Sequence, residues 1–161
     1  VGLGDVLEQS VDRVTERSGL NILIDADRNI RLPLLQEREM WRVAQEALAN
    51  VERHAQATAV RIVWRCDGQR ALIEVTDNGV GFEAGRAGRL DSYGMLGMRE
   101  RASSIGATLE ILSAPDRGTR VRCVLDPSEE DTGHRPAEIH GADQAAIAAT
   151  NQTADAVGAW R

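Results

Sequence analysis

Residues 70–82 read RALIEVTDNGVGF, an alternating stretch that runs straight into a polar turn with two glycines. The alternating apolar residues share one face of the expected strand: Ala71, Ile73 and Val75. The same period of two points Asp77 inward, where a carboxylate costs free energy unless a partner donates hydrogen bonds to it or neutralises it. Two interpretations remain open at this point. Asp77 begins a simple turn, or Gly79 and Gly81 clear space for a flat ligand beside the carboxylate.

The composition indicates one domain with a tail. The chain has 161 residues, a net charge of -6 and only 3% aromatic residues, so aliphatic side chains must fill a core of moderate size. The acidic balance argues against a nucleic-acid partner and against direct contact with a membrane surface. No apolar run approaches the roughly 18 residues that span a bilayer.

The cysteines and the first residues indicate where the protein works. Cys66 and Cys123 are far apart, lack C-x-x-C spacing and fall on apolar faces, so we expect reduced core thiols in a cytoplasmic setting. The opening residues, VGLGDVLEQS, lack the charged start and apolar centre of a signal peptide. Because the chain begins on Val1, we expect it to be a piece of a longer protein.

Hydrophobic periodicity predicts a helix and a hairpin before Asp77. LNILID (20–25) reads as a strand, and an amphipathic helix extends over 34–54 after Pro33, with apolar residues at three- and four-residue steps. TAVRIVWRC (58–66) is a second alternating strand. The residues DGQ reverse the chain from it into the strand that ends at Asp77, which predicts a hairpin.

A loop, a helix and a second hairpin follow. Residues 82–97 contain four glycines and no periodicity, so we expect a mobile loop of the kind that often closes over a ligand. Residues 95–106 read as a helix stopped by Gly106, and 107–112 and 119–125 read as two strands joined by a turn. Thr119 shares the apolar face of the last strand, so a second polar group faces inward.

This order of elements predicts a two-layer α/β sandwich, with a mixed, mostly antiparallel sheet covered by helices on one face. Residues 1–19 are expected to be a short helix or linker, the end of a preceding helical domain, and 20–126 to be the folded domain. Residues 127–161 are acidic, Ala-rich and without apolar period. They predict a disordered tail, with a weak helix near 142–150.

One stripe of the long helix collects polar groups. Glu46, Asn50 and His54 are four residues apart, with Arg53 beside them. A purely structural helix would turn such a stripe to water. The functional alternative is that the stripe combines a carboxylate, an amide oxygen for a hard cation and two groups for phosphate. Magnesium on a nucleotide takes only one or two protein ligands, so Asn50 alone would suffice.

The segment YGMLGM (93–98) places two glycines just before the predicted helix, where free N–H groups and the helix dipole favour an anion. The alternative is a flexible hinge at Gly94. Neither a G-x-G-x-x-G nor a G-x-x-x-x-G-K-[ST] motif explains these loops.

Four segments together are more specific than any one of them. QEALANVERHA (45–55), DNGVGF (77–82), YGMLGMRERA (93–102) and GTRV (118–121) resemble, in order and spacing, the N, G1, G2 and G3 boxes of the GHKL ATPase superfamily. The N-x-x-R-H-A ending and GMRERA look like the catalytic ATP-binding domain of bacterial sensor histidine kinases that work with NarL-type response regulators. The resemblance covers about two thirds of the chain, residues 20 to 125. It implies the Bergerat ATP-binding fold.

The resemblance also implies roles for single residues, with ATP and Mg²⁺ as cofactors. Asp77 would accept a hydrogen bond from the adenine amino group, with Gly81 leaving room for the ring and Thr119 joining through water. Asn50 would be the magnesium ligand, and Glu46 the acid that orients a water or the metal shell. Loop 82–97 would be a lid whose glycine amides close on the phosphates. The implied cofactor-binding set is Asp77, Gly79, Gly81, Arg53, His54, Gly94, Met95, Leu96, Gly97 and Thr119.

Kinases of this type transfer the γ-phosphate to a histidine on a separate dimerisation domain, and no segment here resembles that domain. We therefore expect a chain that binds Mg-ATP, needs the histidine-bearing domain as its partner and acts indirectly on a NarL-type regulator. It would be the cytoplasmic end of a larger sensor, whether or not that sensor is membrane-anchored. The alternatives are a standalone anti-sigma-factor serine kinase and a nucleotide-binding regulatory module without turnover.

Overall fold

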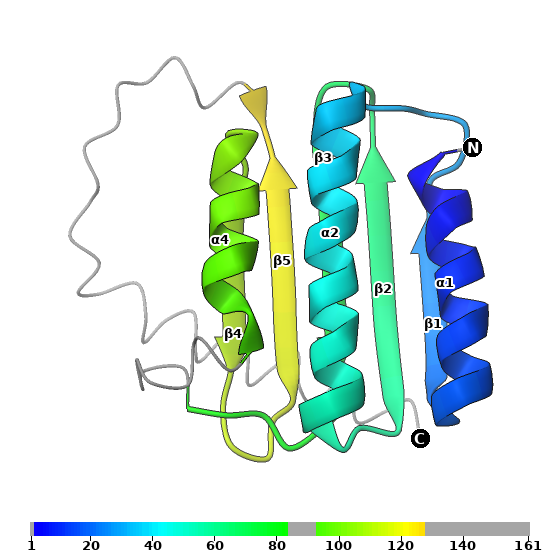
Figure 1. The fold of residues 1–161 in the computed structure, drawn as a ribbon, viewed down its shortest axis with the longest axis vertical. Coiled ribbons are helices and arrows are strands. Elements are labelled where there is room, and N and C mark those ends of the chain that lie inside the picture. Colours follow the sequence, from blue (N-terminus) through cyan, green and yellow to red (C-terminus); the bar gives the residue numbers. More distant parts are fainter. Residues whose placement is uncertain (1, 84–92, 128–161) are drawn as a thin grey trace.

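The computed structural model describes residues 2–83 and 93–127. In these residues a five-stranded sheet carries its helices on one face (Figure 1). The helices are α1 (Leu3–Ser18), α2 (Leu34–Asn50), which continues into a π-helical turn η1 (Val51–Ala55), and α4 (Met95–Ser104). The strands are β1 (Asn21–Ala26), β2 (Ala59–Cys66), β3 (Ala71–Asp77), β4 (Thr108–Ser113) and β5 (Thr119–Leu125). The predicted two-layer α/β sandwich is confirmed.

The strand order is β1-β2-β3-β5-β4, with β1 parallel to β2 and the other neighbours antiparallel. β3 therefore lies in the middle of the sheet. Its last residue, Asp77, pairs with Val60 of β2 on one side and Thr119 of β5 on the other. The sheet thus places the two polar groups predicted to face inward side by side.

Alternation along β3 is as predicted from the sequence: Ala71, Ile73, Val75 and Asp77 are buried. The core beneath the helices is mainly aliphatic and includes the fully buried Met40 and Trp64. Cys66 and Cys123 are both free and buried, as expected. Among the described residues, no helix has the length and apolar character needed to cross a bilayer.

The first helix packs on this same core. Its buried face consists of Leu3, Leu7, Val11 and Val14, with Gly4 against the backbone of Asp27. Of the two alternatives for residues 1–19, a short helix or a linker, the helix is therefore the one present, and its apolar residues join those of the sheet. The division of the chain between residues 19 and 20 stays a prediction. Of the expected tail from residue 127 onward, residues 128–161 lie outside the described part of the chain.

Two element boundaries differ from the sequence interpretation. The helix expected to run to His54 ends as an α-helix at Asn50 and finishes as η1. The loop expected over 82–97 is shorter at its end, because α4 begins at Met95 and includes Gly97. Residues 84–92 of that loop lie outside the described part.

A buried carboxylate ties α1 to α2. Glu37 is only 5% exposed, and its Oε1 accepts a hydrogen bond from the backbone N–H of Leu3 at 2.9 Å. Its Oε2 accepts from Nε and Nη2 of Arg31, at 3.0 and 2.8 Å. Because the first N–H groups of a helix have no partner within the helix, Glu37 caps α1 from a neighbouring element.

Replacing Glu37 with alanine is expected to lower the free energy of unfolding by about 1–3 kcal/mol, because the Leu3 N–H and the Arg31 guanidinium both lose their acceptor. Urea unfolding followed by tryptophan fluorescence measures the change. Glu16→Ala, on the exposed side of α1, is the control and should stay within about 0.5 kcal/mol of the parent. Equal midpoints for the two variants would contradict the capping role of Glu37.

Candidate functional site

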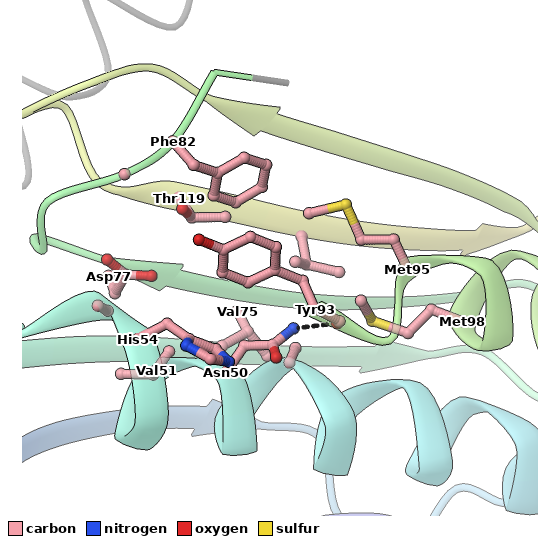
Figure 2. Close-up of a pocket in the computed structure, with 14 residues that line it drawn as sticks. Asn50, Val51, His54, Val75, Asp77, Phe82, Tyr93, Met95, Met98 and Thr119 are labelled. Carbon is pink, nitrogen blue, oxygen red and sulfur yellow. Dashed lines mark hydrogen bonds between the residues drawn. The ribbon is translucent and has the colours of Figure 1, made fainter. Parts of the chain in front are cut away.

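A pocket lies between the end of α2, the ends of β3 and β5 that meet at Asp77 and Thr119, and the start of α4 (Figure 2). Most of its wall is apolar, from residues that include Val51, Val75, Phe82, Met95, Met98 and Val121. Five side chains with polar atoms join them: Asn50, His54, Asp77, Tyr93 and Thr119. An apolar concavity with a few polar groups is typical of a small-molecule site.

Asp77 is the buried acid of this pocket. It is 4% exposed, and its Oδ1 accepts a hydrogen bond from the N–H of Gly79 at 2.8 Å. Burial raises the pKa of Asp77 to about 6, although backbone N–H groups of Gly79 and Thr119 pull it the other way. The turn expected from Asp-Asn-Gly and the inward-facing carboxylate are therefore both present.

The two glycines after Asp77 are required by the chain's own backbone. A Cβ on Gly79 would lie 2.1 Å from the carbonyl oxygen of Ala55, which accepts a hydrogen bond from the N–H of Val80 at 2.7 Å. Gly81 has φ +60°, and its Cβ would lie 2.0 Å from the carbonyl oxygen of Ala114. Gly81 lines the pocket, whereas Gly79 faces Ala55 instead. Sequence reasoning missed these backbone contacts.

The π-helical turn η1 shapes the other wall. Its carbonyl at Ala55 meets the chain after β3, and the next residue, Gln56, has φ +50°. A π-helical turn holds more residues than an α-helical turn, so it shifts the faces of the residues within it. His54 lines the pocket, whereas Arg53 is exposed and is not part of the wall. No glycine or proline in the segment signals this turn.

Asn50, the last residue of α2, presents an unpaired acceptor. Its Nδ2 donates a hydrogen bond to the carbonyl oxygen of Tyr93 at 2.6 Å (Figure 2). Its Oδ1 is buried and has no hydrogen-bond partner within the described residues. A buried acceptor without a donor is rare in folded proteins, and an amide oxygen is a suitable ligand for a hard cation.

The start of α4 rests on the predicted acid of α2. Gly94 has φ +62°, and a Cβ there would lie 2.4 Å from Oε1 of Glu46. Glu46 itself is not part of the pocket wall, unlike Asn50 one turn further on. The residues predicted from the G2 box also fall into two groups, one in the pocket wall and one outside it. Met95 is buried in the wall, while Leu96 and Gly97 lie on the exposed side of the first turn.

Two wall residues were missed from the sequence. The Phe82 and Tyr93 rings stack with centroids 4.6 Å apart and planes at 16°. Tyr93 also meets His54 edge-on, with centroids 4.7 Å apart. They are the only phenylalanine and the only tyrosine of the chain. That scarcity, with Phe82 at the start of the predicted loop and Tyr93 just before the predicted helix, was the signal available in the sequence.

Comparison with known proteins identifies the family. Residues 36–129 match the family model described as histidine kinase-, DNA gyrase B-, and HSP90-like ATPase. The chain belongs to this ATPase family, and ATP, the predicted ligand, is the ligand of the family.

Named relatives narrow the comparison. The chain is 33% identical over 130 residues to the sensor protein VraS of Staphylococcus saprophyticus, covering 81% of this chain and 37% of VraS. It is 31% identical over 140 residues to the sensor histidine kinase LiaS of Bacillus subtilis, covering 86% of this chain and 38% of LiaS. The chain thus spans less than two fifths of the length of these relatives.

Solved structures share the fold. The blue-light activated histidine kinase EL346 of Erythrobacter litoralis superposes with a TM-score of 0.66 at 20% identity, over 82% of this chain and 44% of that one. The histidine kinase AdeS of Acinetobacter baumannii gives 0.59 at 11% identity, over 77% and 62%. The ATP-binding fold predicted from the sequence is confirmed.

Titration of Asp77 should appear in the stability of the protein. Its pKa in the native chain, about 6, lies above the ordinary value of 3.8. Between these values the native state holds a proton that the unfolded chain has released. The free energy of unfolding therefore falls as pH rises from about 4 to 6, and the loss persists above that range.

Asp77→Asn removes this dependence, so the variant is expected to be more stable than the parent at pH 8. Its advantage should be about 1.4 kcal/mol smaller at pH 5, because that pH lies one unit below the native pKa and one pKa unit corresponds to about 1.4 kcal/mol. Urea unfolding of both proteins at the two pH values measures the difference. If the stability difference between Asp77→Asn and the parent were the same at both pH values, the raised pKa of Asp77 would be contradicted.

Proposed function

We propose that this chain is the ATP-binding part of a sensor histidine kinase. It binds Mg-ATP in the pocket beside Asp77 and supplies the γ-phosphate to a histidine on a separate dimerisation domain. Membership of the ATPase family and the names of the relatives, which are sensor kinases, support this proposal. The same names favour it over an anti-sigma-factor serine kinase and over a binding module without turnover.

The observation that carries the proposal is the buried carboxylate of Asp77. A carboxylate offers about four acceptor positions, and the backbone N–H groups of Gly79 and Thr119 use only part of that capacity. An adenine amino group in the pocket would donate to the remainder. A guanine would present a carbonyl oxygen at that place, so two acceptors would meet and binding would weaken.

The residues around Asn50 fit a magnesium ion that is shared with the nucleotide. The described residues hold no group of three or more His, Cys, Asp or Glu that could bind a metal by themselves. Magnesium usually takes one or two protein ligands together with phosphate oxygens, and Asn50 Oδ1 is an available oxygen. When bound, the ion neutralises charge on the phosphates. Glu46 would orient its outer shell.

The phosphate end of the site would lie at the start of α4. The N–H of Met98 bonds to the carbonyl of Gly94, so the N–H groups of the residues before it are the free donors of the first turn. Such donors bind anions. Within the proposal the amides of Gly94 to Gly97 hold the phosphates, with His54 at the pocket wall. Arg53 would have to reach them from outside the wall.

Two protein partners belong to this proposal. We propose the histidine-bearing dimerisation domain as the direct protein partner and a response regulator of the NarL type as the indirect one. The GMRERA segment of α4 supports this class. Neither a nucleic acid nor a membrane surface is proposed as a ligand, because the net charge is -6. We propose a cytoplasmic location for the domain, where ATP is available.

Asp77→Asn tests the base-recognition role. The amide nitrogen would oppose the adenine amino group, so ATP binding is expected to weaken at least 100-fold, about 2.7 kcal/mol. Isothermal titration calorimetry with Mg-ATP measures the affinity. Asp67→Asn, in the exposed β2–β3 turn, is the control. Unchanged affinity of the Asp77 variant would refute the base assignment.

Asn50→Ala tests the metal-ligand role. The parent chain is expected to label an added dimerisation domain from γ-labelled ATP only when Mg²⁺ is present, and not to label itself. The Asn50 variant should lose this transfer by at least about 100-fold, since loss of outer-sphere partners alone costs about 10- to 100-fold. When Mg²⁺ is absent, the Asn50 variant should bind ATP with much of the affinity of the parent. A fully active variant would refute the ligand role.

A further inference from the structure

The pocket beside Asp77 is filled by a side chain of the protein itself. The remaining cavity is about 30 Å³. One water molecule needs about 10–15 Å³ on this measure, whereas ligand pockets are about 300–1,000 Å³. Figure 2 shows the Tyr93 ring in the middle of the pocket, with its hydroxyl on the side of Asp77 and Thr119. A nucleotide base has no room while the ring is there.

Two aromatic contacts hold the ring in this place. Phe82 stacks on one side at 4.6 Å, and His54 meets it edge-on at 4.7 Å. Both arrangements are favourable geometries for aromatic pairs. Phe82 follows β3 and His54 lies in η1, so the ring bridges opposite walls of the pocket.

The backbone of Tyr93 is fixed independently of its ring. Its carbonyl oxygen accepts from Asn50 Nδ2 at 2.6 Å, and the next residue, Gly94, lies against Glu46. The ring can therefore leave the pocket by rotation of its own side chain while the main chain keeps its contacts with α2. Neither of these contacts involves the sheet, so opening the pocket in this way would require no change in the strands.

We infer that Tyr93 is an internal competitor for the nucleotide base, occupying the place of the adenine ring until ATP displaces it. This inference rests on the proposed function. A protein whose binding-competent state is only partly populated binds with an affinity reduced by that fraction. Removing the Tyr93 ring should therefore strengthen ATP binding. An aromatic that contacts the bound base would give the opposite sign, and a purely structural one would change stability without strengthening binding.

The decisive variants are Tyr93→Ala and Tyr93→Phe in the full chain. Tyr93→Ala is expected to lower the Kd for Mg-ATP at least about threefold, because the contacts with Phe82 and His54 each correspond to a factor of about two to ten. Tyr93→Phe keeps the ring and should stay within about twofold of the parent. Calorimetry measures all three proteins. Equal or weaker binding by Tyr93→Ala overturns the inference and leaves the proposed function standing, whereas failure of the parent and both variants to bind removes both.

A second measurement needs no substitution. Tyr93 is the only tyrosine of the chain, so labelling with 3-fluorotyrosine gives a single ¹⁹F resonance. Saturating Mg-ADP is expected to move this resonance towards its position in the urea-unfolded chain, where the ring is exposed to water. A resonance that stays in place at a nucleotide concentration shown by calorimetry to be saturating overturns the inference.

Discussion

The site depends on one unfavourable placement, a carboxylate at the end of the central strand with almost no exposure to water. The register of β3 with both neighbours holds Asp77 there, since pairing with Val60 and Thr119 leaves the strand no freedom to turn the side chain outward. Slipping the strand by one residue would also move its apolar residues out of the core. Burial of the apolar residues of β3 therefore stabilises the register that keeps Asp77 buried. This burial raises the pKa of Asp77 to about 6.

The topology then brings the other groups to that acid. Because β1 and β2 are parallel, α2 must carry the chain back along the sheet between them, and its end arrives where β2 begins and β3 ends. Asn50 and His54 thus line the same pocket as Asp77, although they belong to the helical layer and Asp77 belongs to the sheet. β5 adds Thr119 on the far side, and α4 begins beside Asn50 (Figures 1 and 2).

Much of this could be predicted from the sequence, because the relevant patterns are local. The period of two along residues 71–77 sets the direction of Asp77, and the period of the long helix puts Asn50 and His54 on one stripe. What escaped prediction depends on contacts between distant segments. The π-helical turn forms where the carbonyl of Ala55 meets Val80. The need for glycine at position 79 comes from the same carbonyl. No local pattern carries either contact.

The pairing of β3 with β5 has a consequence for folding and for change in length. α4 and β4 lie between these two strands in the chain, so the centre of the sheet closes only when distant segments meet. Non-local closure of this kind slows folding. Its entropic cost grows slowly with loop length, by about 0.6 kcal/mol for each doubling. A change in the length of the connection between β3 and β5 therefore alters the free energy of closing the sheet only slightly, so the register at Asp77 is retained.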